Sequence, residues 1–140
     1  MNVEDGWIGA EGEEEGRPVL VRVRDISLEA IPEDEFPHLL SSTWRFGEDR
    51  DGSGLPSAKQ YAELERFELV FDKMEEDGSG VLAIVRTHAG SVEHVAFVRD
   101  VEEGIAAIRA ARPKRGDFEL AASPDNRWDE YRAARDALVE

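Results

Sequence analysis

The stretch that decides the fold is SAKQYAELERFELVFDKMEEDG, residues 57–78. Ser57 with Gln60 three residues later is a capping box, in which each side chain bonds a backbone N–H left free at the start of a helix. Apolar residues then recur at three- and four-residue spacing: Tyr61, Leu64, Phe67, Val70, Phe71 and Met74. Gly78 supplies the residue that ends such a helix. The stretch therefore predicts an amphipathic helix that packs one face against a sheet.

Two β-prone runs, residues 81–87 and 92–99, follow this helix. The glycine in the intervening His88-Ala89-Gly90-Ser91 predicts a hairpin, although the type of turn stays open. The length of the turn decides whether His88 and His94 share a face of the sheet, because side chains alternate along a strand. A two-residue turn would put the two histidines on opposite faces.

Upstream of the helix, alternating patterns predict two more strands, at residues 19–24 and 38–46. In the first strand, Arg22 and Arg24 are expected to border solvent. In the second, Trp44 lies on the face that we expect to be the core side, because two aromatic residues share that face.

Downstream, Asp100 with Glu103 predicts the start of a second helix, which Pro113 ends. Alternation over residues 118–122 predicts a last strand, and Asp125 is placed to cap a terminal helix. The full order is β-β-α-β-β-α-β-α. We therefore predict an α+β fold with a ferredoxin-like split β-α-β-β-α-β sheet, extended by an N-terminal strand and a C-terminal helix.

The composition fits one domain over residues 17–140, preceded by an acidic segment over residues 1–16. That segment holds six acids and no base, so we interpret it as a solvated, partly disordered lead-in or as an arm for a basic partner. The chain has no cysteine, which excludes disulfides and thiolate sites. Without a secretory signal or a long apolar run, we expect a cytoplasmic location.

Charge narrows the classes of partner. The chain carries 32 acids against 17 bases, a formal net charge of −15. Such a surface repels phosphate backbones and anionic lipid, so we expect neither nucleic acid nor membrane as a partner.

One loop, Asp49-Arg50-Asp51-Gly52-Ser53-Gly54, has the oxygen donors and glycine of the start of a calcium loop. The position that should supply a bidentate glutamate is Gln60, which already caps the helix. The sequence therefore favours an ordinary polar turn over a metal site here.

The other candidate site residues each have a plain structural alternative. Glu93 with the histidines at 88 and 94 could hold a metal or act as acid and base, but scattered histidines are usually surface residues. Trp44 and Trp128 could line a groove, but aromatic residues at strand and helix spacing are usually core. No serine has the sequence context of a known nucleophile. We expect no cofactor.

The combined pattern resembles the bacterial domain-of-unknown-function family numbered 695, over about residues 16–132. The motifs that carry this resemblance are Arg17-Pro18-Val19, Phe36-Pro37, Trp44-Arg45-Phe46, Gly54-Leu55-Pro56, Leu64-Glu65, Gly90-Ser91-Val92-Glu93-His94, Phe97, Asp100, Asp125, Trp128, Glu130 and Tyr131. His94 stands where an aromatic residue commonly follows the hairpin glutamate of the family. The resemblance implies a fold and no activity. The chain is also distantly similar to the regulator of ribonuclease activity B, an acidic ferredoxin-like inhibitor of an endoribonuclease.

Three functional hypotheses follow from these observations. The first is a non-enzymatic, acidic interaction or regulatory module for a basic protein partner. The second is a small-molecule-binding or hydrolytic domain using Glu93 and His94 with the Asp49–Asp51 loop. The third, compatible with both, is a homo-oligomer joined through an exposed sheet face. The residues predicted to contribute to binding are Trp44, Asp49, Asp51, Glu93, His94, Asp125 and Trp128.

Overall fold

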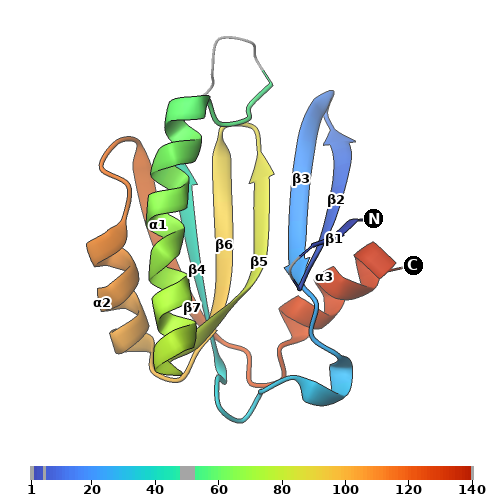
Figure 1. Ribbon diagram of the computed structural model, residues 1–140, viewed down its shortest axis with the longest axis vertical. Helices are drawn as coiled ribbons and strands as arrows, with labels where there is room; N and C mark the ends of the chain where they lie inside the picture. Colours follow the sequence, from blue (N-terminus) through green and yellow to red (C-terminus); the bar gives the residue numbers. More distant parts are fainter. Residues whose placement is uncertain (1, 5, 48–52, 140) are drawn as a thin grey trace.

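The computed structural model describes residues 2–4, 6–47 and 53–139. These residues form one seven-stranded antiparallel sheet with the strand order β1-β2-β3-β5-β6-β4-β7 (Figure 1). The strands are β1 (Asn2–Glu4), β2 (Trp7–Glu14), β3 (Arg17–Arg24), β4 (His38–Arg45), β5 (Gly80–His88), β6 (Ser91–Val98) and β7 (Asp117–Pro124). The helices are η1 (Leu28–Ala30), α1 (Ala58–Asp77), α2 (Val101–Ala111) and α3 (Asp129–Val139).

The predicted ferredoxin-like core is confirmed. The segment β4-α1-β5-β6-α2-β7 arranges its strands in the order β7-β4-β6-β5, with every neighbouring pair antiparallel. The crossover from β4 to β5 carries α1, and the crossover from β6 to β7 carries α2. Both helices therefore cover the same face of these four strands (Figure 1).

The predicted helix signals act as expected. Ser57 and Gln60 form the reciprocal capping box, and Gly78 ends α1 in the left-handed conformation with φ 74°. Asp100 caps α2 by accepting a hydrogen bond from the backbone N–H of Glu103. Because these signals are local, the sequence alone places both helices to within a residue or two.

The N-terminal segment differs from the expected lead-in. Residues 7–14 form β2, which pairs along its whole length with β3 and so joins the sheet. Glu15 and Gly16, the last two residues of the expected lead-in, form the hairpin turn, with φ values of 54° and 79°. Such a two-residue turn with positive φ matches the twist of paired strands. The strand escaped sequence analysis because glutamates and glycines fill most of it, and only Ile8 is a buried anchor.

The core lies on both faces of the sheet. On the first face, α1 and α2 pack over a cluster that includes Leu40, Trp44, Phe67 and Phe71. On the second face, Trp128 and Tyr131 at the start of α3 and Phe36 in the loop before β4 pack over sheet residues that include Val23, Ile84 and Phe97. This second layer covers the β2–β3–β5 half of the sheet. Among the described residues, no helix combines the length and apolar character needed to cross a bilayer.

Candidate functional site

The structure does not bring Glu93 and His94 together. They are neighbours on β6, so their side chains lie on opposite faces of the sheet. On the α3 side, Glu93 accepts hydrogen bonds from Ser41 Oγ at 3.1 Å and Arg86 Nη1 at 2.9 Å. On the α1 side, His94 is fully buried. The predicted partners Asp49 and Asp51 lie outside the described residues.

The two hairpin histidines also lie apart. The turn consists of Ala89 and Gly90 alone, with φ values of 49° and 82°, and His88 pairs directly with Ser91. This register puts His88 and His94 on opposite faces, which excludes a site that both would share. Within the described ranges, no three histidine, aspartate or glutamate side chains gather closely enough to hold a metal ion.

The two tryptophans and Asp125 have structural roles. Trp128 is completely buried, stacks on Phe97 with ring centroids 4.1 Å apart, and donates its indole N–H to the Phe36 carbonyl at 2.8 Å. Trp44 is equally buried. Asp125 caps α3, because its carboxylate accepts from the backbone N–H groups of residues 129 and 130. Of the alternatives that the sequence left open, the structure supports the core for Trp128, whereas the buried Trp44 also contributes to the lining of a hollow.

A groove that the sequence did not reveal runs between α1 and the β2–β3 hairpin. The hairpin extends the sheet beyond α1, and no other helix covers this face of its strands (Figure 1). The resulting cavity has a volume of about 250 Å³ and is mainly apolar. We call it the α1–β3 groove; its lining includes Gly9, Glu11, Leu20, Tyr61, Leu64 and Val85.

Tyr61 marks the mouth of this groove. The helical pattern placed it with the core residues, yet its side chain is 40% exposed. It lies one turn before Leu64 and two turns before Glu68, on the flank of α1 that faces β3. A large aromatic side chain is thus available to a ligand in the groove.

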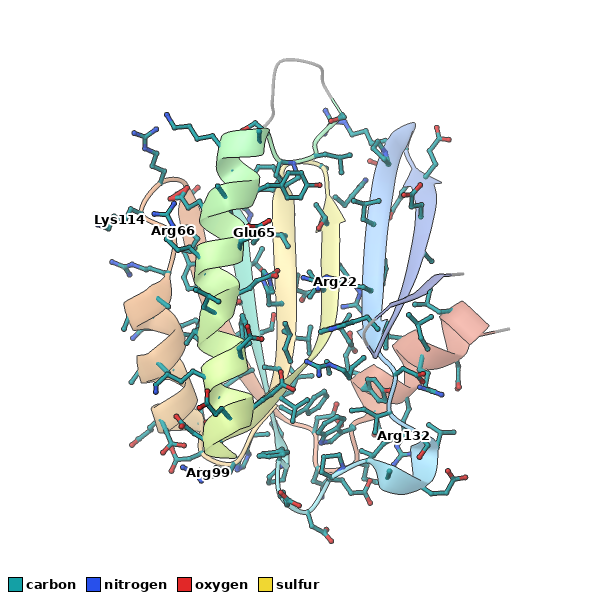
Figure 2. The ribbon with its side chains drawn as sticks, viewed as in Figure 1. Arg22, Glu65, Arg66, Arg99, Lys114 and Arg132 are labelled. Atoms are coloured by element: carbon teal, nitrogen blue, oxygen red, sulfur yellow. The ribbon has the colours of Figure 1, made fainter. Side chains whose placement is uncertain are left out.

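Two residues of the groove lining, Arg22 and Glu68, belong to a charged network that joins three elements. Arg22 on β3 donates from Nη2 to both oxygens of Glu68 on α1, at 2.9 and 2.8 Å. Glu68 Oε2 also lies 2.7 Å from His94 Nε2 on β6. The exposed fractions of these side chains fall from 40% for Arg22 to 21% for Glu68 and 0% for His94. Figure 2 shows Arg22 between β3 and α1.

The contacts of Glu68 determine its protonation state. Burial by itself raises the pKa of Glu68, but the hydrogen bond and charge of His94, together with Arg22, outweigh it and leave the pKa below its usual value. The carboxylate is therefore ionised and accepts, which makes His94 Nε2 the donor. The imidazole stacks on Phe71 with centroids 5.3 Å apart. Its Nδ1 has no hydrogen-bond partner among the described residues.

The network holds charged side chains in place but is poorly arranged for catalysis. Both oxygens of Glu68 accept hydrogen bonds from charged or aromatic protein donors, and its lowered pKa makes the carboxylate a weak base toward a substrate proton. His94 is stacked in the core and does not line the groove. The arrangement fixes the groove wall instead of activating a nucleophile.

A comparison with known protein families shows to which family the chain belongs. The model of a family of unknown function, DUF695, matches residues 5–134. The chain belongs to the DUF695 family. No curated protein matches it. The predicted similarity to the regulator of ribonuclease activity B stays a prediction.

The DUF695 match begins earlier than the resemblance seen in the sequence. It starts at residue 5 and so includes β2, whereas the motifs began at Arg17. Both walls of the α1–β3 groove therefore lie inside the segment that defines the family.

Acidic side chains line the rim of the groove in this DUF695 chain. On β2, Glu11 and Glu13 pair with Leu20 and Pro18 and so share the face of the sheet that α1 covers farther along. On α1, the exposed Glu65 and Asp72 each lie one turn from a groove residue. Arg22, the one cation among the described lining residues, is already bound to Glu68. The groove therefore combines an apolar floor with a negative rim.

Proposed function

We propose that this chain is a non-enzymatic interaction module whose α1–β3 groove binds a basic segment of a partner protein. The observation that carries the proposal is the combination of an apolar floor, an exposed aromatic residue and a carboxylate rim in one groove. A segment that alternates lysine or arginine with large apolar side chains would complement both features.

The floor and the rim of the groove are expected to contribute to binding in different ways. Exposed aromatic residues beside an apolar pocket are typical anchors of binding energy, and Tyr61 has this position. The rim carboxylates mainly raise the rate of encounter with a cationic partner, as does the net charge of −15. Because these charges are exposed, their contribution falls as the Debye length shortens from about 10 Å at 0.1 M salt to about 3 Å at 1 M.

The arrangement of possible catalytic groups supports binding over catalysis. Glu93 and His94 lie on opposite faces of the sheet, and both oxygens of Glu68 are already bonded to Arg22 or His94. The hydrolytic hypothesis built on Glu93 with His94 therefore gains no support from this geometry.

The test is affinity capture from a bacterial lysate with matched variants of the immobilised protein. Tyr61→Ala removes the anchor, and Glu65→Lys reverses the charge of the rim. Leu69→Ala is the control, because Leu69 is the most exposed large apolar residue of α1, at 61%, and does not line the groove. We expect a basic protein to be captured at low salt by wild type and the Leu69→Ala variant, and lost with the two groove variants.

Two results would contradict the proposal. One is a lysate that yields no specific partner at low salt. The other is a partner captured equally by all four proteins, because that partner would bind a different surface.

A further inference from the structure

A second hollow lies on the opposite flank of α1. Its volume is about 340 Å³, within the range of small-molecule sites. We call it the basic pocket; its lining includes Trp44, Phe46, Lys59, Glu63, Arg66 and Arg115. No described residue lines both this pocket and the α1–β3 groove.

Among the described residues, the cations of this pocket form no ion pair with a carboxylate, which sets them apart from most other cations that the structure describes. In the part of the chain that the structure describes, each of the following bases forms an ion pair: Arg22, Arg24, Arg45, Lys73, Arg86, Arg99, Arg132 and Arg135. Lys59, Arg66 and Arg115 form none with the described residues. Acids outnumber bases almost two to one in this sequence, so three unpaired cations in one hollow are a specific feature.

The surroundings of the pocket strengthen its positive charge. Lys114, which precedes Arg115 in the chain, lines a separate open hollow on α2 and the loop after it together with Arg109 and Arg112, and these three cations also lack ion pairs among the described residues. Figure 2 shows Lys114 and Arg66 on the same side of α1. The first turn of α1 contributes Lys59 and contains no acid, so the positive end of the helix dipole adds to the same field.

The walls of the pocket are held by hydrogen bonds. Trp44 Nε1 donates to the Arg115 carbonyl at 2.6 Å, which fixes the loop that carries the Arg115 side chain. Gly116 allows this approach, because a Cβ there would lie 2.3 Å from the Arg45 carbonyl oxygen. On the other wall, Gln60 Nε2 donates to the Phe46 carbonyl at 3.2 Å. The backbone around the pocket is thus organised before any ligand arrives.

We propose that the basic pocket binds a small molecule that carries at least two adjacent phosphate groups. A guanidinium presents a planar fork of donors that matches phosphate oxygens, and two arginines with a lysine can share several such oxygens. Phe46 and the edge of Trp44 supply an apolar wall for the rest of the ligand. Glu63 is the one carboxylate in the part of the lining that the structure describes, and it would accept from a hydroxyl or amino group. This site is independent of the proposed function, because it uses other residues and a ligand of opposite charge.

The test is titration of the full chain with sodium pyrophosphate at constant ionic strength, followed by calorimetry and by the indole N–H resonances in NMR spectra. The resonance of Trp44, assigned through Trp44→Phe, should shift because its N–H bonds the pocket loop. Arg66→Gln and Arg115→Gln should each weaken binding about tenfold, since each removes a charge-assisted hydrogen bond. Arg127→Gln, which removes an exposed cation elsewhere, should change the affinity less than about twofold.

The proposal also predicts selectivity. Inorganic phosphate should bind at least about tenfold more weakly than pyrophosphate, because it engages fewer of the cations. Absence of saturable heat up to about 10 mM, which is beyond the range of weak specific binding, would overturn the proposal. So would equal losses in Arg127→Gln and the pocket variants, or equal affinity for phosphate and pyrophosphate.

Discussion

Replacement of Glu68 by glutamine should destabilise the fold by about 2 kcal/mol at neutral pH, although the change is nearly isosteric. The contribution from Arg22 is small, because its side chain is 40% exposed and solvent screens an exposed pair to about 0–1 kcal/mol. The larger part comes from His94, whose side chain is fully buried and would lose its charged acceptor. A glutamine oxygen can accept from only one of these partners at full strength, so a loss of 1.5–3 kcal/mol, roughly that of one charged hydrogen bond, is expected.

The stabilisation by Glu68 should depend on pH in a defined direction. The pKa of Glu68 lies below its unfolded value of about 4.5. The stabilisation from its ionised form is therefore fully present above pH 4.5, and it disappears as the pH falls through the lower folded pKa. The difference in unfolding free energy between wild type and Glu68→Gln should be largest near pH 7 and should narrow steadily below pH 4.5.

Urea unfolding at a series of pH values measures this difference. Glu65→Gln is the matched control, because Glu65 lies one turn earlier on α1, is exposed and has no bonded partner among the described residues. Its effect should stay within about 0.5 kcal/mol, as for most surface substitutions. If Glu68→Gln were no more destabilising than Glu65→Gln at pH 7, or if the gap stayed constant down to pH 3, the network would not carry the stability assigned to it.

Two further predictions concern backbone contacts. Gly116→Ala should destabilise the fold by about 2 kcal/mol more than Gly78→Ala, because both glycines have positive φ but only a Cβ at residue 116 would meet the Arg45 carbonyl. Thermal unfolding of both variants measures this difference, and equal losses of stability would contradict the close approach of Gly116 to Arg45. Tyr131→Phe should cost about 1–3 kcal/mol in urea unfolding, because the buried hydroxyl bridges backbone groups of the segment after β3. Tyr61→Phe, at the exposed mouth of the groove, should be nearly neutral, and a similar loss there would contradict this account.

The sequence predicts the ferredoxin-like core well because its signals are local. The capping box at Ser57 and Gln60 and the glycine at 78 act within a few residues, so no tertiary information is needed to place α1. The strand at 7–14 has no such signal. Its identity depends on pairing with β3, and alternating glutamates hide the single buried anchor, Ile8.

The candidate sites are harder to predict because they join distant residues. Glu93 and His94 looked like a pair since they are adjacent, but adjacency on a strand separates two side chains onto opposite faces. The actual partner of His94 is Glu68, 26 residues away, and the partner of Glu68 on β3 is 46 residues away. A helical pattern shows that Glu68 lies off the apolar stripe, but it cannot show which strand that flank will meet.

The net charge alone predicts only one of the two classes of binding partner that we propose. Lys59 and Arg66 are seven residues apart on α1, and so are Glu65 and Asp72; each pair therefore lies on one side of the helix. The first pair lies toward α2 and the second toward β3, as Figure 2 shows for Arg66 and Glu65. One helix thus separates a cationic flank from an acidic one. Salt would weaken binding at both, so salt dependence cannot distinguish a basic segment in the groove from a phosphorylated molecule in the pocket. The Glu65→Lys and Arg66→Gln variants can distinguish these two binding modes, because the neighbouring substitutions act on opposite sides of the same helix.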